Sequence, residues 1–227
     1  SETVFGIRWY AQKNFGYDIK YIPGVMIPTV QLAIKRLKKI SEKARLFASL
    51  LENSDKFPRH ELCPEVSDEQ LLTKKQVLQA LGFDESNYSD TTTARTSGNQ
   101  FLAVRGLERK NNIYSLNDLN ELIRSRLPEG FPYVPFSTGN GVRIKWSEAL
   151  FCCFANQFHR DKQTIYSELW MPHIDTLNED LSPTKKKLKR KDELSNVQSI
   201  FQRWGYGDYS MSTHQFRHLL NTIANTN

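Results

Sequence analysis

The chain has 227 residues, of which 39% are hydrophobic and 11% aromatic. This composition provides enough apolar surface for a folded core and excludes a wholly disordered protein. The formal net charge of +6 fits a polyanionic partner, because Lys and Arg side chains release counterions from phosphates. Charge alone does not separate nucleic acid from an acidic membrane surface.

The cysteines argue against a metal-binding protein, and the hydropathy pattern argues against a membrane-spanning one. Cys63, Cys152 and Cys153 are odd in number and lack the CxxC spacing of metal sites. We therefore expect reduced, buried thiols in a cytoplasmic protein, with no bound metal or cofactor. No apolar run approaches the length of a membrane span and no signal-peptide pattern is present, so we expect no membrane association.

The first third of the chain predicts a β-hairpin followed by one long helix. Residues 4–10 and 18–23 are rich in β-branched and aromatic side chains, and turn-forming Asn14 and Gly16 lie between them. Across 28–53, apolar residues recur at three- and four-residue steps, which indicates an amphipathic helix. Lysines crowd its remaining surface; they are typical of a solvated face, and a phosphate-facing surface is the alternative.

The middle third predicts two capped helices. Residues 54–68 are polar, contain prolines and are expected to form a connector. Thr73 suits the N-cap and Gly82 the C′ position of one helix, while Ser115 caps a second helix that runs to Arg126. Between the helices we expect loop with some helix over 84–98 and a short strand over 101–104.

The last third predicts mainly helix. We expect a buried helix over 146–158, a short amphipathic helix over 197–204, a turn over 205–209 and a final helix over 211–223. A strongly basic run before the short helix includes Lys185, Lys186 and Lys187. Such runs are typical of solvated or disordered loops, and contact with backbone phosphates is the alternative.

The final helix carries the residues that are best suited to chemistry. A capping box of Ser212 and Gln215 is expected to fix its start. At 100° per residue, His214, Arg217 and His218 share one face, and an apolar stripe on the opposite face is expected to anchor the helix in a core. An arginine fork and imidazole N–H groups near the positive end of a helix dipole suit a phosphodiester, and such fixed cations need no metal.

This helix resembles the second conserved box of the tyrosine recombinase (phage integrase) family, which is written HxxRH. The matching segment is Thr213-His214-Gln215-Phe216-Arg217-His218 followed by Leu219-Leu220-Asn221-Thr222. The N-terminal hairpin is similar to a hairpin of the family that carries a lysine in its loop, here Gln12-Lys13-Asn14, and whose next strand closes on Ile22-Pro23. Arg203-Trp204-Gly205 and Ser147-Glu148-Ala149-Leu150-Phe151 are similar to segments of bacterial integrase-like proteins.

The resemblance implies cleavage of one DNA strand through a 3′-phosphotyrosyl link, which a 5′-hydroxyl then attacks. It makes His214 a donor to the scissile phosphate, Arg217 the second of two phosphate-binding arginines, and Lys13 the general acid, with Lys20 the weaker candidate. The expected DNA contacts outside this catalytic set are His218, Lys20, Lys185, Lys186 and Lys187. The implied partner is double-stranded DNA, with self-association on DNA left open.

The departures from the family pattern concern the first arginine, the nucleophilic tyrosine and a His or Trp that follows the HxxRH box in the family. The family's first arginine would precede Ser1, and its nucleophilic tyrosine would follow Asn227. Tyr206 and Tyr209 precede the box and are not assigned as the nucleophile. We therefore expect a piece of a longer DNA strand transferase that binds DNA without cleaving it.

A second resemblance gives an alternative function. Leu72-Thr73-Lys74-Lys75-Gln76-Val77 and Tyr114-Ser115-Leu116-Asn117-Asp118-Leu119 are similar to the first and last parts of excisionase-like winged helix-turn-helix domains. Four basic residues lie between them: Arg95, Arg105, Arg109 and Lys110. The alternative is a non-catalytic DNA-binding regulator that uses 71–126, although a purely structural helical insertion is also open.

The expected fold class is α+β, mainly helical. The expectation is a tyrosine-recombinase-like catalytic core with an antiparallel β-hairpin and an inserted helical module similar to winged helices. The hairpin and long helix occupy 1–57, the inserted module 58–128, and the part of the core with the HxxRH box 129–227.

Overall fold

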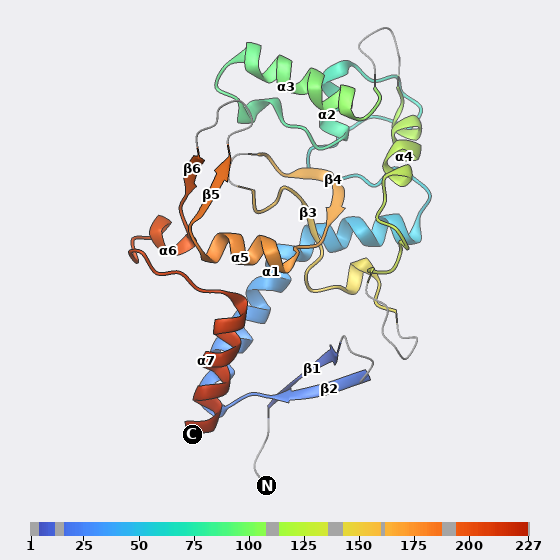
Figure 1. Cartoon of the computed structure of the whole chain (residues 1–227). Coiled ribbons are helices and arrows are strands. Elements are labelled where there is room, and N and C mark those ends of the chain that lie inside the picture. Colours follow the sequence, from blue (N-terminus) through green and yellow to red (C-terminus); the bar gives the residue numbers. More distant parts are fainter. Residues whose placement is uncertain are drawn as a thin grey trace. The chain divides into compact units, whose positions relative to one another are not determined.

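The chain folds into two compact units of mixed α and β structure. The computed structural model describes residues 5–11, 16–107, 114–135, 143–159, 162–187 and 194–226. We call Ser1–Trp9, Tyr17–Leu32 and Pro172–Asn227 the terminal unit, and Tyr10–Gly16 with Ala33–Met171 the central unit. Within the described residues the strands form three separate two-stranded sheets (Figure 1), and the expected α+β class is confirmed.

The first two elements follow the sequence pattern closely. β1 (Gly6–Ala11) pairs with β2 (Gly16–Tyr21), and the Ile22 N–H donates to the Phe5 carbonyl at 2.9 Å, which confirms the hairpin. A short 3-10 turn, η1 (Gly24–Met26), leads into α1 (Ile27–Asn53), which confirms the long helix.

The hydrophobic core lies in the central unit. The second half of α1 buries one face there, with Ala44, Phe47, Ala48 and Leu51 all at or below 3% exposure. Among the described residues, this core cluster takes members from 44–154 only, so the terminal unit contributes none. No helix in the described part of the chain is long and apolar enough to cross a bilayer.

The two capped helices of the middle third are confirmed. α2 (Lys74–Ala80) starts at a capping box of Thr73 and Gln76, and α4 (Leu116–Ser125) starts at one of Ser115 and Asp118. Gly82 stands at C′ of α2 with φ 81°, where the Phe83 N–H donates to the Leu78 carbonyl at 2.8 Å. The Gly82 N–H also donates to the Gln79 carbonyl at 2.9 Å, and the two bonds together form a Schellman motif.

The segment between these helices corrects the sequence interpretation. A 3-10 turn, η2 (Glu85–Asn87), precedes α3 (Thr91–Val104), so the strand expected over 101–104 is the last turn of a helix. The Asp90 carboxylate caps α3 by accepting from the Thr92 and Thr93 N–H groups at 2.8 and 2.9 Å. The buried face of α3 consists of Ala94, Gly98 and Leu102.

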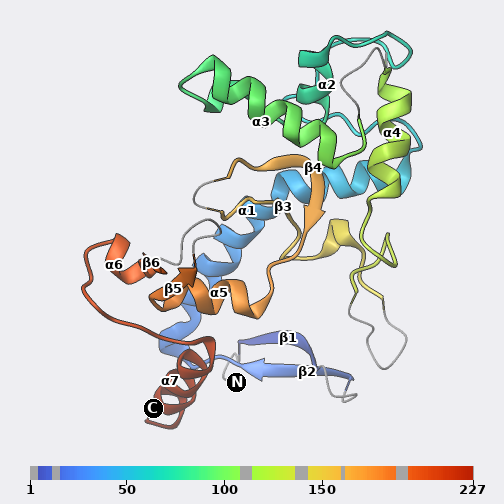
Figure 2. The same cartoon turned by 45° about the horizontal axis from the view of Figure 1, so that its top comes forward.

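The prediction of a helix over 146–158 is also wrong. The chain there forms a 3-10 turn, η3 (Trp146–Glu148), and then β3 (Cys153–Ala155), which pairs antiparallel with β4 (Ile165–Trp170). Phe154 packs edge-on against Phe47 of α1 with ring centroids 5.6 Å apart, and the Ser167 hydroxyl donates to the Leu81 carbonyl at 2.6 Å. β3 and β4 therefore lie beside α1 and next to α2 and α3 (Figure 1, Figure 2).

The terminal unit is completed by Pro172–Asn227. α5 (Ile174–Leu181) precedes β5 (Thr184–Lys187), which pairs antiparallel with β6 (Leu194–Val197). Part of the basic run is thus a strand rather than a loop. α6 (Ile200–Arg203) and α7 (Thr213–Thr226) confirm the short and final helices, although the short helix is confined to its second half.

Candidate nucleic-acid interface

The start of α7 is held by two sets of hydrogen bonds. The Ser212 N–H donates to Gln215 Oε1 at 2.7 Å and the Gln215 N–H to Ser212 Oγ at 3.3 Å, which confirms the capping box. From α5, Asn178 Oδ1 accepts from the Thr213 N–H at 2.9 Å, and the Leu181 carbonyl accepts from the Met211 N–H at 3.2 Å. The first turn of α7 is therefore fixed to α5, and its free N–H groups are partly satisfied by side chains.

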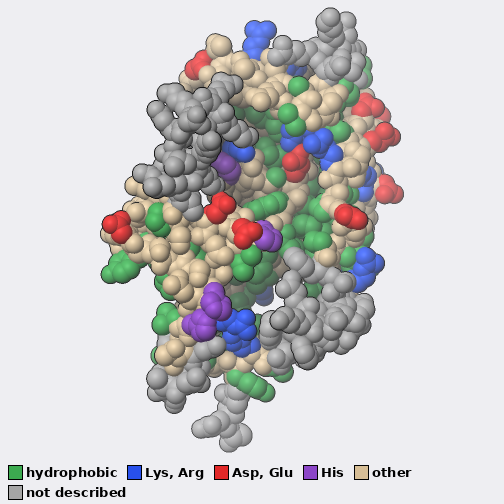
Figure 3. Space-filling view, in the orientation of Figure 1, with side chains coloured by type: hydrophobic (Ala, Val, Ile, Leu, Met, Phe, Trp, Pro, Cys, Tyr) green, Lys and Arg blue, Asp and Glu red, His purple; other side chains and the backbone are tan. Residues whose placement is uncertain are grey.

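The polar face of α7 is open to solvent. His214, Arg217 and His218 are all exposed, and histidine side chains lie at the surface over α7 in Figure 3. The Nε2 atoms of His214 and His218 are 2.8 Å apart, at hydrogen-bond distance, and their rings meet edge to face at 4.4 Å. Within the described part of the chain, Arg217 has no hydrogen bond or ion pair, so its guanidinium is available to a ligand.

Arg203, another arginine of the terminal unit, differs from Arg217 in having a carboxylate partner. Arg203 of α6 donates to Asp180 of α5 at 2.6 Å and to the Gln198 carbonyl at 2.9 Å. This arginine ties two helices together, and its charge is offset by a carboxylate. Arg217 carries no such neutralising partner among the described residues.

The apolar face of α7 departs from expectation. Phe216 and Leu219, which the periodicity assigns to a buried stripe, are 37% and 49% exposed. α7 is therefore attached to its unit through the hydrogen bonds at its start rather than through deep burial of these two side chains. The side chain of Leu220 lies outside the described set.

The other sequence-predicted DNA contacts are placed only in part. Lys20 is exposed on β2 and belongs to the terminal unit, together with α7. Lys13 lies outside the described residues. The backbone of Lys185, Lys186 and Lys187 lies in β5, where these residues pair with Asn196, Ser195 and Leu194.

The helical module of the alternative hypothesis is compact. α3 packs closely on α2, since a Cβ added at Gly98 would lie 3.1 Å from a Leu78 methyl group. The outer face of α3 is polar, and its exposed side chains include Thr91, Thr92, Thr93, Arg95, Thr96 and Gln100. Arg105, which the sequence offered as a further basic contact, instead pairs with Glu168 of β4 and lies over the Phe101 ring at 3.5 Å. Of the four basic residues in this segment, Arg105 therefore has its charge offset by a carboxylate.

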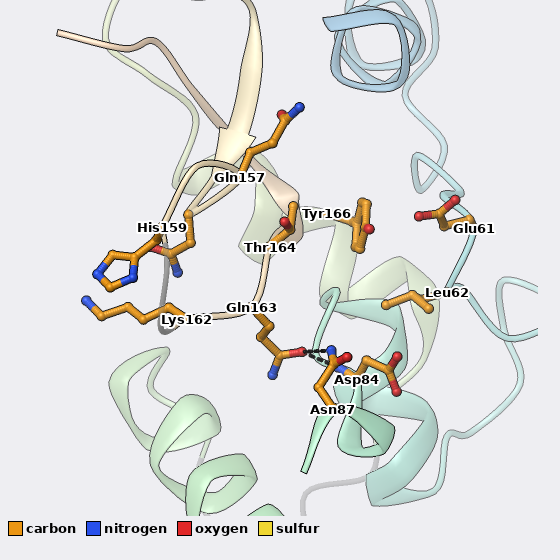
Figure 4. A pocket seen from close by; sticks show the side chains of 11 residues that line it. Glu61, Leu62, Asp84, Asn87, Gln157, His159, Lys162, Gln163, Thr164 and Tyr166 are labelled. Carbon is orange, nitrogen blue, oxygen red and sulfur yellow. Dashed lines mark hydrogen bonds between the residues drawn. The ribbon is translucent and has the colours of Figure 1, made fainter. Parts of the chain in front are cut away.

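A polar pocket of about 550 Å³ in the central unit was not foreseen from the sequence. Gln163 Oε1 accepts from the Asp84 N–H at 2.9 Å and from Asn87 Nδ2 at 3.1 Å, as Figure 4 shows. These bonds fix the amide orientation and leave Gln163 Nε2 buried, with no hydrogen-bond partner in the part of the chain that the structure describes. On the far side of the pocket, the Lys43 ammonium lowers the pKa of the Glu61 carboxyl by donating to it, and the nearby Tyr166 hydroxyl acts in the same direction.

The cysteines behave as the sequence indicates. All three are free thiols; Cys152 and Cys153 are buried and Cys63 is partly buried. Burial raises the pKa of Cys63 and Cys153 to about 11 and that of Cys152 to about 12. In the described residues, no three His, Cys, Asp or Glu side chains are grouped as a metal site.

Comparison with known proteins adds no family assignment. No protein-family model matches the chain, and no match is found among the curated proteins or the solved structures. Functional inference therefore rests on the residues and the geometry given above.

Proposed function

We propose that this chain binds the phosphodiester backbone of double-stranded DNA through the exposed face of α7, as part of the catalytic domain of a tyrosine-recombinase-type strand transferase. The observation that carries the proposal is the guanidinium of Arg217, which has no partner among the described residues, beside the His214–His218 pair on a helix whose start is firmly fixed. The tyrosine recombinase fold itself is part of this proposal.

The chemistry of this face fits a phosphate group. A guanidinium offers two parallel N–H donors to two phosphate oxygens and stays charged at all relevant pH values. Each imidazole has one N–H in its neutral form, and protonation adds a second donor and a positive charge. In the proposed role, His214 and Arg217 hold the scissile phosphate, while Lys13 or Lys20 protonates the leaving oxygen in the intact enzyme.

We propose DNA binding for this chain and assign no nucleophile for strand cleavage. The resemblance assigns no tyrosine of this chain as the nucleophile, because Tyr206 and Tyr209 come before the HxxRH box. Binding can therefore be measured on this chain separately from cleavage.

The test is fluorescence anisotropy of a labelled duplex over a series of salt concentrations. Arg217→Ala is expected to weaken binding about tenfold or more, because a charge-assisted bond is lost, and to reduce the slope of log K against log salt by about 0.9. Arg217→Lys should recover only part of the affinity, since an ammonium lacks the bidentate fork. Lys56→Ala, which removes one exposed charge in the central unit, is the matched control; equal losses in Arg217→Ala and Lys56→Ala would refute the proposal.

The second candidate function uses the α2–α3–α4 module. It is favoured by the long exposed polar face of α3, with Arg95 at its centre, because such a helix can enter a major groove. In the same anisotropy assay, an Arg95→Ala loss larger than the Arg217→Ala loss would favour the regulator. We rank it second because its Arg105 is used in an internal ion pair.

A further inference from the structure

The segment between α6 and α7 exposes three large aromatic side chains. Trp204, Tyr206 and Tyr209 are 74%, 67% and 69% exposed. We call Trp204–Tyr209 the aromatic loop; its sequence, WGYGDY, alternates aromatic residues with glycines. Exposing the apolar surface of a large ring to water costs free energy, so a group of exposed aromatic side chains commonly marks a binding site.

The aromatic loop is held in one shape by its own hydrogen bonds. Trp204 stands at the C-cap of α6, and Gly205 follows it at C′ with φ 77°. The Tyr206 N–H donates to the Phe201 carbonyl at 2.8 Å, and Gln202 Nε2 donates to Asp208 Oδ1 at 2.9 Å. The rings are therefore presented on a fixed backbone, so binding would lose little conformational entropy.

The aromatic loop and the polar face of α7 share one support. Arg203 ties α6 to α5 through Asp180, and the first turn of α7 is bonded to Asn178 of the same helix. Tyr209 precedes His214 by five residues, so their Cα atoms are separated by at most about 17 Å. The Tyr209 ring and the phosphate-binding residues of α7 thus lie within a few nucleotides of each other.

We propose that Trp204, Tyr206 and Tyr209 stack on unpaired bases of a DNA strand whose phosphates contact α7. The inference deepens the proposed function and rests on it. Base faces fit exposed rings, because stacking tolerates any base and needs no apolar groove around the ring. The polar and glycine neighbours within the loop, and the cationic face that follows it, match a strand that alternates bases with phosphates rather than an apolar protein surface.

The test compares three DNA ligands of the same sequence on the whole chain: a blunt duplex, a duplex with a short single-stranded gap, and a single strand. Trp204→Ala and Tyr206→Ala are each expected to weaken binding of the gapped and single-stranded ligands by about 5- to 150-fold, the range for one lost stacking contact. Binding of the blunt duplex should be nearly unchanged. Trp204→Phe should retain much of the affinity because it keeps a ring.

Two controls separate stacking from a general effect. Phe158→Ala removes an aromatic side chain of the central unit that is 51% exposed, and it should bind all three ligands as the unaltered chain does. Single-stranded DNA should also quench tryptophan fluorescence in the unaltered chain, and the quenching should be smaller in Trp204→Phe. Thermal unfolding of each variant shows that the fold is kept.

The outcomes distinguish the two proposals. Stacking is overturned if Trp204→Ala and Tyr206→Ala bind the gapped ligand normally, or lose affinity equally for the blunt duplex. The phosphate site is overturned if Arg217→Ala binds all three ligands normally while the aromatic variants still discriminate among them. A chain that binds none of the three ligands overturns both.

Discussion

The imidazoles of His214 and His218 face each other across one turn of α7, with their Nε2 atoms 2.8 Å apart. In this pair one Nε2 donates and the other accepts, so the two rings hold different tautomers when both are neutral. The bond occupies one donor of the pair, and a phosphate would compete for it. Arg217 lies between them in the sequence and on the same exposed face.

This spacing predicts sensitivity to a transition-metal ion. With metal–nitrogen bonds of about 2.0–2.1 Å, a separation of 2.8 Å subtends roughly 90° at the metal, which suits neighbouring positions around Ni²⁺ or Cu²⁺. We expect Ni²⁺ to weaken duplex binding in the anisotropy assay by drawing both rings away from phosphate, and a chelator to reverse the effect. Isothermal titration with Ni²⁺ alone checks the binding directly.

The matched control for this prediction is another exposed histidine. His173→Ala removes a ring at the N-cap of α5 and should leave the Ni²⁺ effect intact, whereas His218→Ala should abolish it. Equal Ni²⁺ sensitivity in His218→Ala and the unaltered chain would contradict the chelation.

Gly82 and Gly106 give a paired test of the packing between α2 and β4. Each glycine ends a helix at C′ with positive φ, 81° and 74°. A Cβ at Gly82 would lie 2.5 Å from the Tyr166 backbone nitrogen, whereas a Cβ at Gly106 would meet no described atom within 4 Å. Gly106→Ala should lower the free energy of unfolding by about 1–2 kcal/mol, the cost of the left-handed conformation; Gly82→Ala should lower it by about 1–3 kcal/mol more, because β4 must move.

Urea denaturation of both variants measures this difference. Similar losses for the two variants would mean that β4 does not approach Gly82 as closely as the structure has it. The comparison removes the backbone term that both positions share.

The elements that could be predicted from the sequence are those with local signals. Thr73, Ser115 and Ser212 each precede a helix by one residue, and each bonds to the third residue of the following turn. Gly82 likewise marks a helix end because few other residues adopt its conformation. These signals act over a few residues, so no knowledge of the tertiary fold was needed.

The errors arose where tertiary packing decides the structure. α3 contains four threonines and a glycine, which lower helix propensity; its helix is stabilised by packing of Gly98 against Leu78, which the local sequence does not reveal. The apolar run around Phe154 suits a buried helix or a buried strand equally well, and only its pairing with β4 selects the strand.

The candidate site was predictable in one respect and not in another. A 100° helical period places His214, Arg217 and His218 on one face without tertiary information, and the structure exposes all three. The exposure of Phe216 and Leu219 depends on what packs beside α7, which periodicity cannot supply. The polar pocket depends on Gln163 meeting Asp84, 79 residues away in the sequence, and no local pattern encodes that contact.

His60 should make stability depend on pH near neutrality. Burial lowers the pKa of His60 below its ordinary value of 6.5, although the Ala80 carbonyl and Glu61 act in the other direction. Its Nε2 lies 2.9 Å from the Ala80 carbonyl and its Nδ1 accepts from the Leu62 N–H, so the neutral ring satisfies both. The unfolded chain takes up a proton below about pH 6.5 and the folded chain does so only at lower pH, so the free energy of unfolding should fall as the pH is lowered from about 7.5 to 5.5.

Replacing His60 with glutamine tests the assignment. A glutamine amide can donate to Ala80 and accept from Leu62, but it does not titrate. His60→Gln should therefore show a flatter pH dependence of urea unfolding over this interval. A curve parallel to that of the unaltered chain would assign the dependence to other groups.

The thiols should resist alkylation in the folded chain, and for two separable reasons. The thiolate is the reactive form, and a rise in the pKa of Cys63 from 9.0 to about 11 reduces the thiolate fraction at pH 8 by about 100-fold. Because Cys63 is only partly buried, its rate of reaction with iodoacetamide should increase about tenfold for each pH unit between about 8 and 10.

Cys152 and Cys153 are buried, so their rates should instead be limited by opening of the central unit and should change less with pH. Mass spectrometry of peptides from a timed reaction separates the three sites, and all three should react quickly in urea. Rapid alkylation of Cys152 in the folded chain at pH 8 would be inconsistent with its burial.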